Sequence, residues 1–139
     1  MKHLILAAFG GITYAALELL CRGHTHWTMI LMGGVCFLLI GGINEYIPWE
    51  MPLLKQSLIG AALVTAAEFV AGCILNLWLG LGIWDYSNQW GNVFGQICPL
   101  FSLIWIGVSM AAIVLDDWLR YLLWGEEWPH YKFCKGRYK

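Results

Sequence analysis

Charge is scarce in this chain of 139 residues: only 12% of them are Asp, Glu, Lys or Arg, and the formal net charge is −1. A nucleic-acid-binding protein needs a strongly basic surface, so this balance argues against a nucleic-acid partner. The chain also lacks a glycine-rich phosphate-binding loop, so we do not expect it to hydrolyse ATP itself. Hydrophobic residues are abundant, at 60% of the total with a mean hydropathy of +0.64. This composition is typical of an integral membrane protein.

Motifs for metal binding, disulfide bonding and catalysis are also weak. The five cysteines do not form a disulfide framework. His24 and His26 would need further zinc ligands, for which only Cys21 and Asp85 are candidates, and a histidine pair in a short polar loop is more often a capping feature. The polar residues of the loops do not form a convincing hydrolase triad. The sequence therefore predicts no metal site, no cofactor and no catalytic residue.

The apolar residues fall into four runs, each long enough to cross a membrane. A helix needs about 20 apolar residues to span roughly 30 Å of hydrocarbon. The first run carries Glu18 and Arg22 where a cleavable signal peptide would have small residues, so we expect it to remain as a helix. The sequence therefore predicts an all-α integral membrane four-helix bundle. Its predicted spans are Leu4–Cys21, Trp27–Ile43, Ser57–Leu79 and Phe94–Leu115.

The distribution of basic residues predicts the orientation of the bundle. Short loops rich in Lys and Arg stay on the cytoplasmic side of a membrane. Four crossings place both termini on one side, where seven of the eight basic residues also fall, and only Arg22 faces the other way. We expect a multi-pass protein of the plasma or inner membrane with both termini in the cytoplasm. The seven residues are Lys2, Lys55, Arg120, Lys132, Lys135, Arg137 and Lys139.

Two regions are expected along the chain. Residues 1–117 are predicted to form the transmembrane domain, and residues 118–139 a cytoplasmic interfacial helix with a basic tail. The mixture of charged and aromatic residues from Asp116 to Trp124 is typical of a helix that emerges at the membrane surface. The basic tail is expected to define the orientation, and contact with anionic membrane lipids is an alternative role.

A faint internal repeat suggests that each half of the bundle is a pair of helices. Both halves would start in the cytoplasm, so the repeat would be parallel, with its pseudo-twofold axis along the membrane normal. The first and third helices would then lie nearest this axis. Rows of small residues, such as Ala7 with Gly11 and Gly107 with Ala111, predict close helix packing and favour a homodimer. At a constant offset of 50, Gly10, Ala16 and Glu18 align with Gly60, Ala66 and Glu68.

Glu68 is the most informative polar residue, because it lies about halfway along the third predicted span. A charged side chain near the bilayer centre costs about 2.5–3.5 kcal/mol on insertion scales, so it should face protein or water. Thr65, Gly72 and Asn76 fall on the same helical face and extend a polar stripe. Glu68 is therefore predicted to be a proton-coupling or ligand-binding residue. The alternative is a packing role, in which Glu68 hydrogen-bonds between helices.

Glu18 occupies a comparable position in the first span, with Tyr14 and Arg22 one turn away on either side. An acid followed four residues later by arginine is an ordinary helix ion pair, which is one reading. If Glu18 and Glu68 are repeat mates, they should approach a common axis. Two carboxylates close together in low dielectric do not both ionise easily, so one would hold a proton.

The longest predicted outer connection contains the string Trp84-Asp85-Tyr86-Ser87. Asp and Ser side chains accept hydrogen bonds from backbone amides in turns, and Trp and Tyr favour the membrane interface. We expect a rigid loop that folds over the polar stripe, with a simple anchoring loop as the alternative. Trp84, Asp85, Tyr86 and Asn76 are therefore included among the predicted ligand-binding residues, with Glu18, Arg22 and Glu68.

Several motifs occur along the chain: Tyr14-x-x-x-Glu18, Arg22-Gly23, Glu68-Phe69-x-x-Gly72, Trp84-Asp85-Tyr86-Ser87 and Asn92-x-x-Gly95-x-Ile97-Cys98. Taken together, these motifs resemble the ABC-transporter type IV (CmpB-like) family of small multi-pass membrane proteins. The resemblance covers roughly Gly10 to Ser109, and it implies a membrane protein related to transporters. The chain departs from the family pattern after Gly23, where many relatives carry a Gly-Pro-rich segment, so a ligand contact in this loop is not carried over.

The predicted function is that of a small transporter or permease-like protein that binds a polar or cationic solute. The solute would bind in an outer-half cavity lined by membrane carboxylates. A structural or regulatory membrane protein is the first alternative, and an intramembrane enzyme acting on a lipid-linked substrate is the second. We expect membrane lipids, a small-molecule solute and a second copy of the chain as partners. An ATPase partner is not supported, because no cytoplasmic connection is long enough to bind one firmly.

Overall fold

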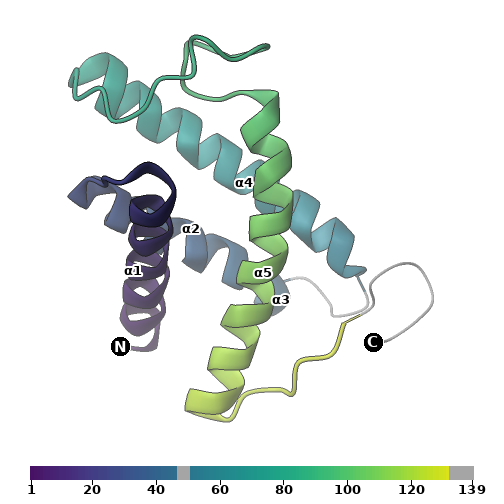
Figure 1. Cartoon of the computed structure of the whole chain (residues 1–139). Helices are drawn as coiled ribbons and strands as arrows, with labels where there is room; N and C mark the ends of the chain where they lie inside the picture. The colour runs from purple at the N-terminus through teal and green to yellow at the C-terminus, as the bar shows by residue number, and fades with distance from the viewer. Residues whose placement is uncertain (47–50, 132–139) are drawn as a thin grey trace.

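The computed structural model describes residues 1–46 and 51–131 and is all-helical over these ranges (Figure 1). No strand occurs in this described part of the chain, and only an isolated bridge joins Val93 and Ile97. The predicted basic tail from Lys132 onward lies outside the described residues. In chain order the elements are α1 (Lys2–Arg22), α2 (Trp27–Gly41), α3 (Ile43–Tyr46), α4 (Leu53–Gly72), the π-helix η1 (Cys73–Trp78) and α5 (Pro99–Trp124).

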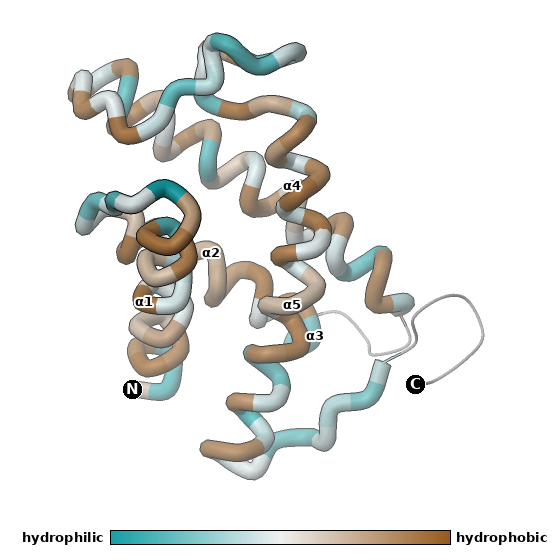
Figure 2. Tube along the Cα trace, viewed as in Figure 1, coloured by the Kyte–Doolittle hydropathy of each residue, from teal (hydrophilic) through white to brown (hydrophobic). Residues whose placement is uncertain are grey.

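Within the described ranges, four helical segments are long and apolar enough to cross a membrane, which confirms the number of predicted spans. The third segment combines α4 with η1, so that helical structure continues from Leu53 to Trp78. Figure 2 shows hydrophobic residues along the helices and more hydrophilic ones in the loop before α5 and after its end. Many large apolar side chains on the helices are exposed, as expected of surfaces that face lipid. The segments are Lys2–Arg22, Trp27–Tyr46, Leu53–Trp78 and Pro99–Trp124.

The last predicted span begins too early. It was expected to start at Phe94, but residues 94–98 form a loop and α5 starts at Pro99. Phe94 and Gly95 have φ angles of 53° and 72°, which a right-handed helix does not accept. Pro99 suits the first turn of a helix, because the amide hydrogen it lacks has no intrahelical partner there. At its other end α5 continues without a break to Trp124.

The helices pack as two hairpins, α1 with α2 and α4 with α5, and α2 contacts both helices of the second hairpin. Small residues allow the close approach of α1 and α2. A Cβ atom on Gly34 would lie 2.7 Å from the carbonyl oxygen of Ala7, so only glycine fits without a backbone shift. By contrast, a Cβ atom on Gly107 would meet nothing within 4 Å, so this member of the predicted small-residue rows does not mediate packing within the chain.

The pairing of helices differs from the repeat-based prediction. That prediction placed the first and third spans, α1 and α4, nearest a common axis. Instead, α2 is the element that packs against α4 and α5, and α1 packs mainly against α2. The buried apolar core lies where α2, α3, α4 and α5 meet, and it contains Ile40, Ile43, Leu53, Val64 and Ile113. The glycines of α2 allow this packing. Gly33 and Gly34 lie against α1, and Gly41 lies against Asp116 of α5, so α2 comes close to both neighbours.

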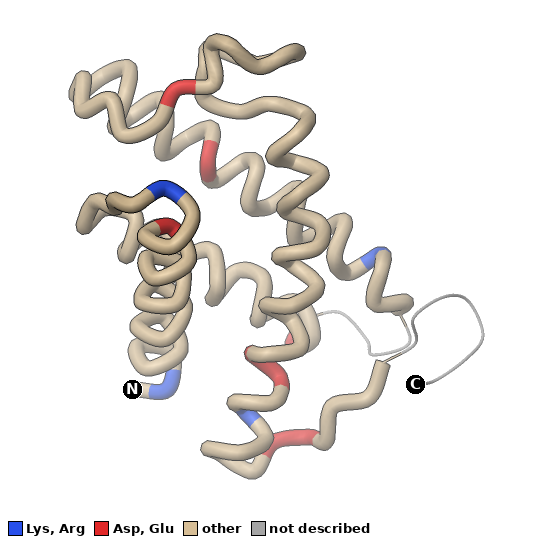
Figure 3. Tube along the Cα trace, in the orientation of Figure 1, with Lys and Arg blue, Asp and Glu red and all other residues tan. Residues whose placement is uncertain are grey.

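Charged residues gather mainly toward the ends of the helices, and α4 carries one acidic position within its length (Figure 3). Two regions result, one beside the loop before α5 and one at the opposite end of the molecule. The first region contains the predicted site residues.

Candidate functional site

Glu68 is buried on α4, with 4% of its surface exposed. Both of its carboxylate oxygens accept hydrogen bonds from neutral donors: the Tyr86 hydroxyl lies 2.8 Å from Oε1, and Trp105 Nε1 lies 3.0 Å from Oε2. These donors come from the loop before α5 and from α5 itself. Among the described residues, no basic side chain forms an ion pair with Glu68. Glu68 therefore faces protein, as predicted, but its charge is not balanced by a neighbouring cation.

The two donors have different chemical capacities. An indole N–H only donates, whereas a phenolic hydroxyl both donates and accepts. Ionised Glu68 accepts from both groups. If Oε1 carries a proton, Glu68 donates it to the Tyr86 oxygen while Oε2 still accepts from Trp105. The carboxyl group of Glu68 can therefore keep a hydrogen bond to each of these two partners in both protonation states, by rotation of the Tyr86 hydroxyl and without displacement of a side chain.

Aromatic rings hold the donors in place. The Tyr86 ring stacks on Phe101, with 4.7 Å between ring centroids and 11° between their planes. Trp105 lies against Tyr14 of α1, at a centroid distance of 6.3 Å. Burial and the neighbouring negative charge of Glu68 both raise the pKa of Tyr86, so its hydroxyl stays protonated near neutral pH and remains available as a donor.

Glu18 and Arg22 form the predicted ion pair on α1, with 2.9 Å between Glu18 Oε1 and Arg22 Nη1. The second carboxylate oxygen of Glu18 accepts a hydrogen bond of 2.7 Å from the hydroxyl of Thr25, in the short connection to α2. Glu18 is 7% exposed, whereas the Arg22 side chain is 41% exposed. Glu18 is therefore fully partnered at the end of α1, and it shares no contact with Glu68 among the described interactions.

A network of hydrogen bonds joins the loop before α5 to the helices beside it. Asn76 Oδ1 accepts from the amide of Ile83 at 2.7 Å, and Asn76 Nδ2 donates to Gln96 Oε1 at 2.8 Å. The carbonyl oxygen of Gln96 accepts from Trp84 Nε1 at 3.0 Å. Arg22 Nη2 lies 3.3 Å from the Ile83 carbonyl oxygen and so connects α1 to the same loop. These bonds place Asn76, Trp84 and Arg22 in one structural unit.

Asp85 has a different role from the other predicted site residues. Its carboxylate accepts from the hydroxyl and the backbone amide of Ser87, and the amide lies 2.9 Å away. These two hydrogen bonds, the hydroxyl first, hold the pKa of Asp85 below its ordinary value. Gly95 is required beside them, because its φ of 72° is unfavourable for other residues and a Cβ atom there would lie 2.8 Å from Asp85 Oδ1. Asp85 thus shapes the turn from which Tyr86 reaches Glu68.

An apolar cavity of about 130 Å³ adjoins the site between the two hairpins. Tyr14 and Trp105 line it, so the indole that donates to Glu68 also forms part of the cavity wall. Its described lining includes no carboxylate. The volume is below the roughly 300–1,000 Å³ typical of pockets for drug-sized ligands. Other lining residues are Phe9, Met32, Cys36, Phe37, Val64 and Ala112.

Three partners of the predicted residues were not identified from the sequence: Trp105, Gln96 and Thr25. Trp105 lies in an apolar run, and its position there matches that of a core or interface aromatic residue. Gln96 falls within the predicted span Phe94–Leu115. An amide side chain is unusual in such an apolar run, and this was the signal that could have identified it. His26, considered above as a metal ligand, instead caps α2, since its Nδ1 accepts from the Thr28 amide at 3.3 Å.

Comparison with known proteins identifies a family for the chain. The sequence model of the family described as "Putative ABC-transporter type IV" matches residues 5–124 of the chain. No curated protein and no solved structure matches it. The matched range contains every predicted site residue and all of the helices except the first three residues of α1.

Proposed function

The chain belongs to this ABC-transporter type IV family, and from that membership we propose that it is a small membrane transporter or permease-like protein whose central proton- or cation-binding residue is Glu68. The observation that carries the proposal is the environment of this carboxylate. It is buried within a membrane-spanning segment and is held by two neutral donors, and no described basic side chain pairs with it. An ionised carboxylate in such a place needs a compensating positive charge.

A proton or a cationic solute supplies that charge. In the protonated form the Tyr86 hydroxyl accepts from Glu68, and in the ionised form it donates, so the loop before α5 responds directly to the state of the carboxylate. Trp105 connects the same carboxylate to the cavity between the hairpins. We therefore assign Glu68 the coupling role, Tyr86 and Trp105 the positioning of its carboxylate, and the loop from Ile83 to Gln96 the cover of the site.

Glu18 and Arg22 are assigned a supporting role. Arg22 is committed to Glu18 and to the Ile83 carbonyl, so it maintains the position of the loop and does not neutralise Glu68. The proposal further places the protein in the plasma or inner membrane with both termini in the cytoplasm, and it retains a homodimer as the expected assembly.

A packing role for Glu68 is the second candidate. The specific observation in its favour is that Tyr86 and Trp105 already satisfy both oxygens, so no ligand is needed to complete the hydrogen bonds. The two candidates differ in what Glu68→Gln does. The glutamine amide oxygen can accept from Trp105 while its NH₂ group donates to the Tyr86 oxygen, so the fold should persist in either case.

The test is uptake of a panel of small organic cations into vesicles that contain the purified protein and carry a pH gradient. Wild-type protein should accumulate at least one cation above empty vesicles, and Glu68→Gln should fall to the empty-vesicle level. Glu127→Gln is the matched control, because the Glu127 side chain is 63% exposed on the segment after α5. Uptake by Glu68→Gln equal to that of wild type would assign Glu68 to packing.

A further inference from the structure

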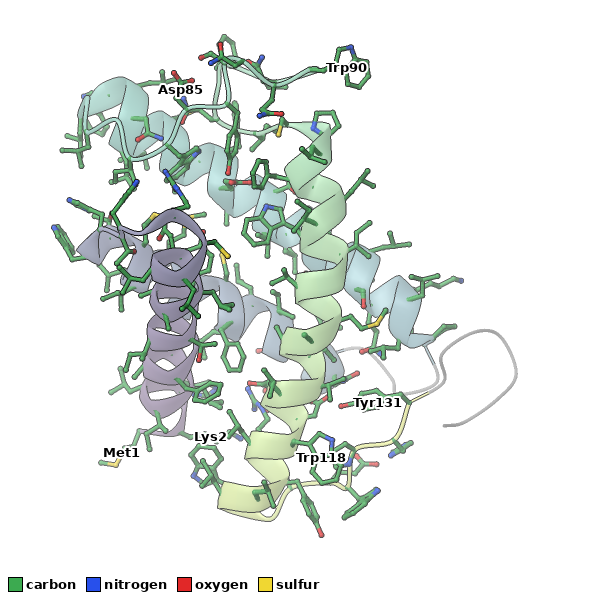
Figure 4. All side chains as sticks on the ribbon, in the orientation of Figure 1. Met1, Lys2, Asp85, Trp90, Trp118 and Tyr131 are labelled. Carbon is green, nitrogen blue, oxygen red and sulfur yellow. The ribbon has the colours of Figure 1, made fainter. Side chains whose placement is uncertain are left out.

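A second cluster of charged residues lies at the end of the molecule opposite the Glu68 site. Figure 4 labels Lys2, Trp118 and Tyr131 at this end and Asp85 and Trp90 at the other. The cluster combines the start of α1, α3, the last turns of α5 and the segment after α5. Its charged members are Lys2, Glu45, Asp116, Asp117, Arg120 and Glu126.

The two cations of this cluster are shared among several acids. Arg120 Nε lies 2.6 Å from Asp116 Oδ2, its Nη1 binds Glu45, and the same Nη1 lies 3.9 Å from Glu126 Oε2. Lys2 Nζ binds Glu126 and lies 3.8 Å from Glu45 Oε1. Among the described residues, these two cations therefore pair with three of the four acids. Each cation pairs with more than one acid.

Asp117 has no cation of its own among the described side chains. Its Oδ2 accepts from Asn44 Nδ2 at 2.6 Å and from the Tyr131 hydroxyl at 2.8 Å, and both donors are neutral. Burial, followed by the negative charge of Asp117, raises the pKa of Tyr131, so this hydroxyl remains a donor near neutral pH. Asp117 is 6% exposed, so water does little to stabilise its charge.

Asp116 is fully buried, with 0% of its surface exposed, and its Oδ1 has no hydrogen-bond donor among the described residues. The carboxylate packs directly against α2 at Gly41, where a Cβ atom would collide with it. The amide oxygen of Asn44 is also buried, and the described part of the chain offers it no donor. A buried acceptor without a donor costs about 1–3 kcal/mol, and more when it is charged. Two adjacent buried carboxylates thus lack one positive charge and one donor, and a single proton supplies both.

We propose that the Asp116–Asp117 pair is a proton-binding site that holds one proton at neutral pH. The proton belongs to the pair, since adjacent carboxylates titrate as a coupled unit. The described groups in contact with the pair are Asn44 from α3, Arg120 from α5 and Tyr131 from the following segment. Glu45 and Glu126 lie around Arg120 and act on Asp116 by their charge, and Lys2 from α1 pairs with both of these acids. Glu45, Glu126 and Lys2 are partly exposed and connect the pair to solvent.

The test is infrared spectroscopy of the full-length protein in lipid nanodiscs, with every aspartate labelled with ¹³C at its side-chain carboxyl. The sequence has three aspartates, and Asp85 is exposed. Wild-type protein at pH 7 should show the isotope-shifted C=O stretch of a protonated carboxylic acid. The band should persist in Asp85→Asn and disappear in the double variant Asp116→Asn/Asp117→Asn.

Absence of the band from labelled wild-type protein overturns the proposal, and this result does not depend on any variant folding. A band that survives the double variant, or one that is lost in Asp85→Asn, also overturns it. The inference is independent of the function proposed for Glu68. Residue 68 is not labelled in the wild type or in Glu68→Gln, so this substitution should leave the aspartate band unchanged. Failure of either proposal is therefore recognisable separately.

Discussion

At the scale of single residues, the chain uses neutral hydrogen-bond donors where a soluble protein would place an ion pair. Tyr86 and Trp105 stabilise Glu68 without cancelling its charge, and Asn44 and Tyr131 do the same for Asp117. Glu18 is the contrast, since Arg22 pairs with it directly. A carboxylate with neutral partners can gain and lose a proton or a cation at lower cost than one with a permanent counter-ion. This difference in hydrogen-bond partners distinguishes Glu68 and Asp117 from Glu18.

One prediction at this scale concerns Asp85 and its turn. Ser87→Ala removes the hydroxyl donor but keeps the backbone amide, so the pKa of Asp85 should rise part of the way toward its ordinary value. Because the native pKa is depressed, the stabilisation by Asp85 is present above its unfolded pKa of about 4 and is lost as the pH falls through the folded pKa. Titration of the ¹³C-labelled carboxyl by NMR, assigned with Asp85→Asn, measures the shift. An unchanged pKa in Ser87→Ala would show that the hydroxyl does not contribute.

At the scale of elements, α2 holds the bundle together, because it contacts α1, α4 and α5. Its approach to α1 depends on glycine. The loop from Leu79 to Cys98 is the other element with a defined role, since Asn76 and Gln96 attach it to η1 and position Tyr86 over α4. The site is therefore a product of one loop and two helices, and it does not reside on a single helical face.

Gly34→Ala and Gly107→Ala test the α1–α2 contact with the same chemical change at two helical positions. At residue 34 the new methyl group meets the Ala7 carbonyl, so we expect a loss of stability of about 1–3 kcal/mol from overpacking. At residue 107 the methyl group has open space, and alanine should be neutral or stabilise the helix by up to about 1 kcal/mol. Thermal unfolding in one detergent measures both. Equal midpoints for the two variants would contradict the packing described here.

At the scale of the whole molecule, the chain has two acidic centres at different levels along the bundle. Glu68 lies beside the loop before α5, and the Asp116–Asp117 pair lies beside the start of α1. The apolar core and the cavity between the hairpins lie between these levels. With both termini in the cytoplasm, as proposed above, the first centre lies nearer the outside and the second nearer the cytoplasm.

The orientation itself is testable with reporters that are active on only one side of the membrane. Reporters fused before Met1 and after Lys139 should both be cytoplasmic, because the Lys- and Arg-rich ends and connections favour that side. A reporter inserted at Trp90, which is 86% exposed in the loop before α5, should be external. A cytoplasmic reporter at Trp90, or termini on opposite sides, would contradict the orientation and reverse the roles of the two centres.

The sequence alone determined the membrane character and the number of spans, because long apolar runs have few alternatives to a spanning helix. It also determined the Glu18–Arg22 pair, since residues four apart on a helix are neighbours wherever the helix lies. It singled out Glu68 by the cost of placing a carboxylate in an apolar span. These inferences depend on local spacing and composition, which can be read directly from the amino-acid sequence.

Only the tertiary structure decided which groups meet Glu68. Tyr86 and Trp105 are 18 and 37 residues away along the chain, and their hydrogen bonds depend on the loop turning back over α4 and on α5 packing beside it. The start of α5 was misplaced for a related reason: Phe94 and Ile97 are as apolar as a span, but the positive φ angles before Pro99 hold them in a loop. The prominence of Asp116 and Asp117 also emerged from the fold. Their sequence reads as an interfacial helix, and only contact with Gly41, Asn44 and Tyr131 removes both carboxylates from water.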